Sequence, residues 1–199
     1  PSQPTFLQEE LEAMVAAARS AGKYAVAHAS TPEGMKRAIL AGVETIEHGD
    51  GGTPEVYQLM KEHGVVFFPT LAAGDAIERY RGWNGSPDTD RIRRKKASVR
   101  LALESGVTIG FGGDVGVYPH GENYRELELM VAYGMQPLEV LKAATSGNAK
   151  TFHLERLGQV KKDYMGDLIA VPGDPIGNIN TLGKVSFVML NGKVVRKDF

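Results

Sequence analysis

Four short apolar runs in this sequence end in side chains that can bind a metal ion or move a proton. The terminal residues of these runs are His28, His48, Thr70 and Asp114. Imidazole nitrogens and carboxylate oxygens are the ligands that zinc and similar divalent ions take in proteins. A zinc ion with an open position lowers the pKa of its water to about 7 and so supplies a nucleophile. The set therefore predicts a hydrolytic metal site with His28, His48 and Asp114 as ligands.

Glycines crowd Asp114 in the segment from Gly110 to Gly116. Residues without side chains would let the backbone and a substrate come close to the carboxylate. Two other interpretations stay open: Asp114 in an ordinary Asx turn, and a phosphate held by Gly112 and Gly113, as in loops after late barrel strands. A single histidine at a strand end is more often a capped polar residue than a ligand. The metal hypothesis therefore depends on the three residues together.

Other polar residues accompany this set. His120 follows in the loop after the last run, where we expect it to contact substrate or a transition-state oxygen, or else to order the loop. Thr70 either lines the cavity or simply ends a strand. Because side chains alternate along a strand, Glu47 should point away from His48 and serve in structural pairing. Two further histidines are expected to be structural: His63 and His153.

The runs belong to a repeat in which a helix ends at a glycine and a short strand follows. Glycine suits the left-handed position just past a helix C-terminus, and the runs are largely apolar rather than strictly alternating, as in parallel strands buried on both faces. Thr31-Pro32 and Thr53-Pro54 each supply an N-cap and a first-turn proline. The repeat predicts a parallel α/β unit whose strand ends, and hence the proposed ligands, meet at one edge. The repeat glycines are Gly22, Gly42, Gly64 and Gly106.

The remainder of the chain divides into a helical part and a strand-rich tail. We predict a loop over residues 74–90, followed by helices over 91–104, 123–133 and 137–152. After residue 154 the pattern changes to two strand segments, 166–171 and 184–196. The second is a hairpin turning at Asn191-Gly192, the strongest short turn signal. We therefore expect one domain over residues 1–154 and a small β region over 155–199.

Composition limits the partners. A net charge of −1 in 199 residues argues against nucleic acid and anionic membranes, and the basic run 91–96 is interpreted as a solvated helix face. Without cysteines there is no disulfide framework, which fits the cytoplasm and the periplasm equally. No run approaches the roughly 18 apolar residues of a membrane span, and no signal peptide is expected. The first residue is Pro1, so we expect a natural start further upstream.

The combined stretches resemble the C-terminal half of amidohydrolase-superfamily enzymes, in the branch of imidazolonepropionase-like proteins and metal-dependent Xaa-Pro dipeptidases. The resemblance covers essentially the whole chain. The stretches that carry it are Ala25–Ala29, Gly42–Gly49, Phe68–Leu71, Gly113-Asp114, Pro119–Gly121, Met135–Thr145 and Gly166–Ala170.

This resemblance implies strands five to eight of a TIM-type (β/α)8 barrel, with part of a small composite β-sandwich. By it, His28 and His48 are ligands from strands five and six, and Asp114 is the strand-eight aspartate that binds metal and shuttles a proton. The implied cofactor is a divalent metal, with zinc expected, as one or two ions. The implied reaction is amide hydrolysis by metal-bound hydroxide, on a dipeptide or another small N-acyl compound.

The chain departs from the family pattern in what it lacks. The family takes a His-x-His pair from strand one and usually a lysine from strand four, and no such pair occurs in this sequence. We therefore expect a partner, either a missing N-terminal half or another copy of the chain, and an oligomeric assembly. The alternative hypothesis is a catalytically incomplete half-barrel, because its outer strands would be open, apolar edges.

Overall fold

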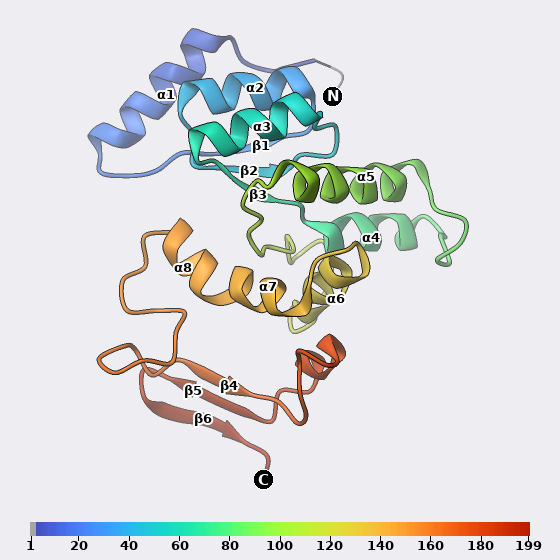
Figure 1. The fold of residues 1–199 in the computed structure, drawn as a ribbon, viewed down its shortest axis with the longest axis vertical. Helices are drawn as coiled ribbons and strands as arrows, with labels where there is room; N and C mark the ends of the chain where they lie inside the picture. Colours follow the sequence, from blue (N-terminus) through green and yellow to red (C-terminus); the bar gives the residue numbers. More distant parts are fainter. Residues whose placement is uncertain (1–2) are drawn as a thin grey trace.

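In the computed structural model, which describes residues 3–199, a parallel sheet and an antiparallel sheet lie toward opposite ends of the molecule (Figure 1). Helices α6 (Tyr124–Ala132), α7 (Pro137–Lys142) and α8 (Asn148–Thr151) lie between the two sheets. None of the helices within residues 3–199 is long and apolar enough to cross a membrane.

The parallel sheet follows the predicted repeat. Its strands are β1 (Val26–Ala29), β2 (Thr45–His48) and β3 (Val66–Phe68), in the order β1-β2-β3. Helix α2 (Pro32–Ala41) connects the first two strands and α3 (Pro54–His63) connects the last two. These helices, together with α1 (Gln8–Ser20), cover one side of the sheet in Figure 1.

Local sequence signals explain where these helices begin and end. The Thr31 hydroxyl accepts the N–H of Gly34 at 3.1 Å, so the predicted N-cap is confirmed. Thr53 caps α3 in the same way through Val56. Gly42 ends α2 with φ of 92°, a left-handed conformation in which any other residue would be strained.

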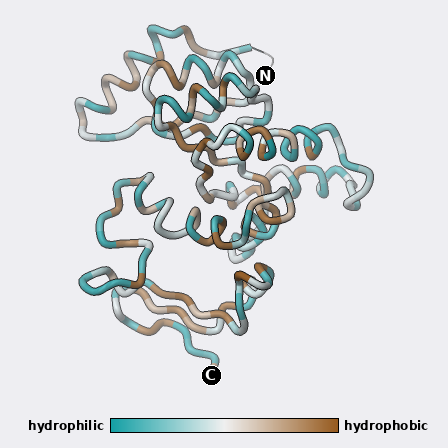
Figure 2. The backbone as a smooth tube through the Cα atoms, viewed as in Figure 1, coloured by the Kyte–Doolittle hydropathy of each residue, from teal (hydrophilic) through white to brown (hydrophobic). Residues whose placement is uncertain are grey.

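The main core lies between this sheet and its helices. Ile46 in β2 and Phe67 in β3 are fully buried, and they face large side chains from α2 and α3. Figure 2 shows hydrophobic residues, in brown, along these strands. The large, fully buried side chains that α2 and α3 contribute to this core are Met35, Ile39, Tyr57 and Met60.

The fourth predicted strand is reduced to a single bridge. Ile109 pairs with Phe67, held by the Phe67 N–H to the Thr108 carbonyl and by the Gly110 N–H to the Phe67 carbonyl. Beyond this point the side chain of Asn148 takes the place of a strand. It accepts the N–H of Phe111 at 3.1 Å and donates to the Phe111 carbonyl at 2.7 Å.

The predicted loop over residues 74–90 is confirmed only for residues 81–89, and the prediction was wrong for its first part. Helix α4 (Leu71–Tyr80) occupies its first part, and α5 (Asp90–Ser105) begins at its end. Gly82 and Gly85, which carry the loop prediction, lie between the two helices. Gly74, where the predicted loop begins, lies inside α4, and a Cβ there would overlap the side chain of Lys95 on α5. Close packing between two helices, rather than a turn, requires this glycine.

One buried carboxylate joins α4 to α6. Glu126 is completely buried, and its two oxygens accept the N–H groups of Leu71 at 2.9 Å and Ala72 at 2.6 Å. These two N–H groups open α4 and have no partner within the helix, so a carboxylate is well placed there. Burial raises the pKa of Glu126 to about 7, although the two N–H bonds and Lys95 act in the opposite direction.

The last predicted helix contains a π-helical turn, η1 (Ala143–Gly147), between α7 and α8. A π-helical turn adds a residue to the helical repeat and so rotates the residues that follow it. Asn148 is the first residue after this turn.

The C-terminal sheet is antiparallel, in the order β4 (Leu168–Ala170), β5 (Phe187–Leu190) and β6 (Lys193–Lys197). The predicted hairpin is confirmed, because β5 and β6 turn at Asn191-Gly192, both with positive φ. Between β4 and β5, the short 3-10 helix η2 (Ile179–Gly183) packs on α6 and buries Ile179 in the main core.

Asn148→Ala should lower the free energy of unfolding by about 1–3 kcal/mol, because the Phe111 N–H and carbonyl lose their partners in a half-buried place. Urea denaturation of both proteins measures this difference. Asn123→Ala is the matched control, since the exposed Asn123 makes no side-chain cap bond at the start of α6. An equal effect of the two substitutions would contradict the role of Asn148.

Glu126→Gln should change how stability depends on pH. Between about pH 4.5 and 7 the folded protein keeps the Glu126 proton while the unfolded chain loses it, so this group's contribution to stability falls as pH rises. At about 1.4 kcal/mol per pKa unit the change approaches about 3 kcal/mol, and the glutamine variant should lack it. Urea denaturation between pH 4.5 and 8 measures both slopes, with the exposed Glu104→Gln as control. Parallel slopes for Glu126→Gln and the unmodified protein would contradict the prediction.

Candidate metal centre and active site

A cavity of about 340 Å³ opens at the carboxyl ends of the parallel strands. Its polar side chains come from three strand ends and from the loop after Ile109. They are His28, Glu47, His48, Thr70 and Asp114. Its apolar wall is formed by Val26, Phe68, Phe111 and Phe152.

The two histidines lie in contact. The Nδ1 atom of His28 is 2.8 Å from the Nε2 atom of His48, and the ring centroids are 4.9 Å apart. Two nitrogens bound to one tetrahedral zinc ion would lie roughly 3.3 Å apart. A small separation of the rings would therefore let both nitrogens bind a single ion.

A left-handed residue at the end of β2 turns His48 toward this cavity. His48 has φ of 74° and is followed by Gly49, also with positive φ. Strict alternation would place His48 on the opposite side from Glu47, but it holds only while the backbone stays extended. Both side chains line the cavity, so the prediction that Glu47 points away from the site was wrong.

Thr70 and Asp114 share this backbone feature, with φ of 48° and 59°. A non-glycine residue in this region costs about 1–3 kcal/mol, most for a β-branched residue such as Thr70. This backbone conformation turns the Thr70 side chain into the cavity, where its hydroxyl lies 2.7 Å from Nδ1 of His48. Of the two sequence interpretations of Thr70, the structure therefore supports a cavity-lining residue.

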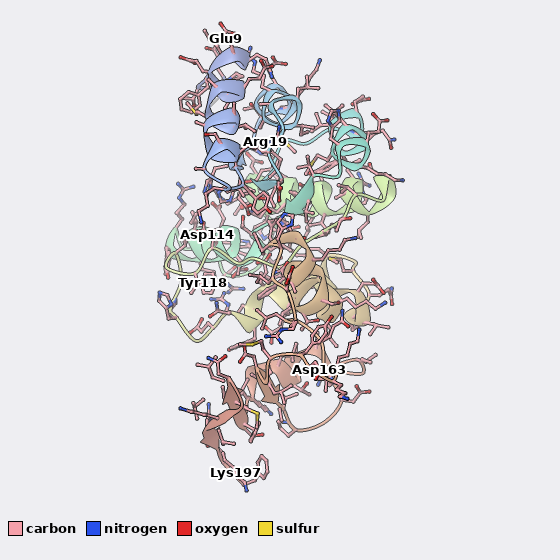
Figure 3. All side chains as sticks on the ribbon, turned by 90° about the vertical axis from the view of Figure 1, so that its left-hand side faces the viewer. Glu9, Arg19, Asp114, Tyr118, Asp163 and Lys197 are labelled. Atoms are coloured by element: carbon pink, nitrogen blue, oxygen red, sulfur yellow. The ribbon has the colours of Figure 1, made fainter. Side chains whose placement is uncertain are left out.

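Asp114 lies at the mouth of the cavity. Figure 3 shows it near the middle of the long axis, close to Tyr118 of the same loop. Gly113 contacts the Tyr118 hydroxyl so closely that a Cβ would overlap it, so packing of the loop also requires this glycine. Within residues 3–199, no group of three histidine, cysteine or acidic side chains is gathered closely enough to hold a metal ion. The histidine pair and Asp114 thus share a cavity without forming a complete ligand shell.

Burial and nearby charges favour neutral forms of two cavity residues. Burial lowers the pKa of His48, and Lys95 and His28 lower it further, against the opposing effect of Asp114 and Asp50. A neutral imidazole is the form that binds metal. Burial likewise raises the pKa of Glu47, against its hydrogen bond from Thr45 and the influence of His28.

His120 is exposed and lies outside the residues that line this cavity. The other two histidines occur elsewhere: His153 pairs with Glu44 at 2.7 Å, and His63 ends α3.

A buried ion pair that was not predicted from the sequence lies near the site. Lys95 was interpreted as part of a solvated basic face, but its side chain is only 3% exposed. Its Nζ atom donates to Asp50 Oδ1 at 2.8 Å and to the Pro69 carbonyl at 2.7 Å. Helical spacing carries the missed signal, because Lys95 shares one face of α5 with the buried residues Ile92, Val99 and Ala102.

The sequence and the fold were compared with those of known proteins. The Amidohydrolase family profile matches residues 1–195. Ochratoxinase from Aspergillus niger is 30% identical over 98% of this chain and 43% of its own length. A crystal structure of a Xaa-Pro dipeptidase with bound methionine in the active site has a TM-score of 0.88 and 38% identity, covering 98% of this chain and 50% of that one.

A second solved structure is a prolidase complexed with N-methylphosphonate-L-proline, with a TM-score of 0.80 and 28% identity over 96% of this chain and 50% of that one. The chain therefore spans about half the length of the relatives it matches. An α/β arrangement common to these structures, together with the family match over nearly every residue, confirms the resemblance seen in the sequence. The chain belongs to the amidohydrolase family.

Proposed function

We propose that the protein containing this chain is a metal-dependent hydrolase of amide bonds in dipeptides or related N-acyl compounds. The observation that carries this proposal is the approach of His28 Nδ1 and His48 Nε2 to 2.8 Å, in a cavity that Asp114 also lines. Membership of the amidohydrolase family supports amide hydrolysis, and its Xaa-Pro dipeptidase, prolidase and ochratoxinase relatives support small amide substrates.

The residues that would hold the metal are His28, His48 and Asp114. Their side-chain types suit a divalent ion, although the three are not gathered closely enough within residues 3–199 to hold one. Zinc is the ion we propose, because two imidazoles and a carboxylate form its usual catalytic ligand set. Such an ion would polarise the amide carbonyl and acidify the attacking water. The family typically uses a divalent metal ion, which supports this assignment.

Asp114 is the proposed proton carrier. Its carboxylate is exposed at the cavity mouth, where it would accept a proton from the attacking water and return it to the leaving nitrogen. A group with this role needs access to both water and substrate, and an exposed position provides both. His120 follows six residues later in the same loop, and we propose it as a substrate contact.

The apolar wall suits the side chain or ring of a small dipeptide. Phe68, Phe111 and Phe152 present carbon surface beside the polar strand ends, so one cavity offers binding for both parts of such a molecule. Its volume of about 340 Å³ lies at the lower end of the range for small-molecule pockets.

We further propose that the parallel strands form one half of a (β/α)8 barrel that another segment completes. Strand β1 pairs with β2 along one edge, and no strand within residues 3–199 covers its other edge. Val26 on this strand is 51% exposed, although parallel strands are normally buried on both faces. A segment equivalent to the N-terminal half of the relatives would cover this edge, and a second copy of the chain is the alternative.

Asp114→Asn in the full-length protein should reduce kcat for dipeptide hydrolysis by a factor of about 10² to 10⁴, because asparagine cannot carry the proton. Steady-state kinetics on a series of Xaa-Pro dipeptides and N-acyl amino acids measures the change. Asp88→Asn, in the loop between α4 and α5, is the matched control and should retain activity. Full activity of the Asp114→Asn protein would refute the proposed role.

The 199-residue chain expressed alone should associate, because an open β1 edge offers unpaired backbone groups. Size-exclusion chromatography with light scattering at several concentrations should give masses above 21.5 kDa. Val26→Lys, which places a charge on the open strand, should reduce association, whereas Leu103→Lys on exposed helix surface should not. A concentration-independent monomer of the unmodified chain would contradict the open-edge proposal.

A further inference from the structure

The Pro69 carbonyl, next to the Thr70 that contacts His48, accepts two hydrogen bonds. The Lys95 ammonium donates to it at 2.7 Å, and the Thr70 hydroxyl donates to it at 2.8 Å. A carbonyl oxygen has two lone pairs, and a hydroxyl has one proton. The Thr70 hydroxyl uses its only proton in the hydrogen bond to Pro69. Its oxygen can therefore only accept a hydrogen bond from Nδ1 of His48, 2.7 Å away.

The hydrogen bond from Lys95 holds the Pro69 carbonyl in position. The lysine side chain is 3% exposed and its charge is paired with Asp50 at 2.8 Å, so the ammonium has little freedom to turn elsewhere. Gly74 on α4 makes room for the lysine stem, since a Cβ at that position would overlap it. Removal of one member of a buried ion pair leaves the other uncompensated, which explains why both occur together.

Thr70 is held from the other side as well. The N–H groups of Leu71 and Ala72, which follow it, are both bound by the buried Glu126. Thr70 itself adopts a left-handed conformation that is unfavourable for a β-branched residue. Lys95, bound to the residue before Thr70, and Glu126, bound to the two residues after it, stabilise this conformation. They thereby fix the orientation of the Thr70 hydroxyl.

We infer that Thr70 is a positioning residue for His48, held by Lys95 through the Pro69 carbonyl. Thr70 accepts the Nδ1 proton of His48, which places the lone pair of His48 on Nε2, the atom that faces Nδ1 of His28. An imidazole fixed in this tautomer presents a ligand nitrogen without rearrangement when an ion arrives. The tautomer assignment stands on the contacts alone, whereas its value for metal binding rests on the proposed function.

The tautomer is tested in metal-free, full-length protein labelled with ¹⁵N-histidine, by two-dimensional NMR of the ring nitrogens at pH 8. The expected result is a proton on Nδ1 of His48 in the unmodified protein and in Thr70→Ser, which keeps the hydroxyl. Thr70→Val should lose this preference. A proton on Nε2 of His48 in the unmodified protein, or an unchanged tautomer in Thr70→Val, would overturn the inference.

The contribution of Lys95 is tested with Lys95→Met combined with Asp50→Asn, so that no buried charge is left unpaired. This double variant should show a mixture of His48 tautomers. Lys96→Met is the control, since Lys96 is exposed and pairs with Asp88 at the surface. A single Nδ1–H tautomer in the double variant would remove Lys95 from the inference.

Zinc affinity, measured by competition with a chromophoric chelator, separates this inference from the proposed function. Thr70→Val should bind zinc roughly 10 to 100 times more weakly than the unmodified protein, and Thr70→Ser should restore most of the affinity. Equal affinities of Thr70→Val and unmodified protein would overturn the positioning role. If the unmodified protein bound no zinc while its His48 tautomer depended on Thr70, the metal assignment would fail and the positioning of His48 would stand.

Discussion

The site depends on left-handed backbone at the ends of the chain's apolar runs. His48, Thr70 and Asp114 all adopt positive φ, and all three side chains line one cavity as a result. Extended backbone would have placed some of them on the helix-covered side of the sheet. Because each such conformation is costly, the surrounding structure must hold it. Buried polar anchors do so around Thr70, through Lys95 on one side and Glu126 on the other.

Features of the fold that depend on nearby residues could be predicted from the sequence. Threonine N-caps, glycine helix ends and the Asn191-Gly192 hairpin are all decided within a few residues, and the structure confirms each of them. Features that depend on distant residues could not. Gly74 was placed at the start of a loop, because the sequence does not show that Lys95 of another helix packs against it. The strand around Ile109 is cut short by Asn148, whose position follows a π-helical turn.

The candidate site shows the same division. Residue types at strand ends were enough to select His28, His48 and Asp114, because parallel strands bring their carboxyl ends together. The orientation of Glu47 was predicted wrongly, since the reversal at His48 breaks the alternation on which that prediction relied. Lys95 was missed for a different reason, because a run of five basic residues within positions 91–96 suggested exposure even though helical spacing placed this one on the apolar face.

The two histidines are supported unequally, and this difference connects the site to the open edge of the sheet. His48 contacts Thr70, whose position is held by Lys95 of α5 and Glu126 of α6. Within the part of the chain described by the structure, His28 has a hydrogen bond to His48 and no other side-chain partner. It also lies on β1, whose outer edge pairs with no other strand of residues 3–199 and whose residues are the most exposed of the sheet. A segment that pairs with β1 would therefore do more than bury apolar surface: it would restrict the backbone that carries His28, and so complete for this ligand the support that His48 already receives from its own chain.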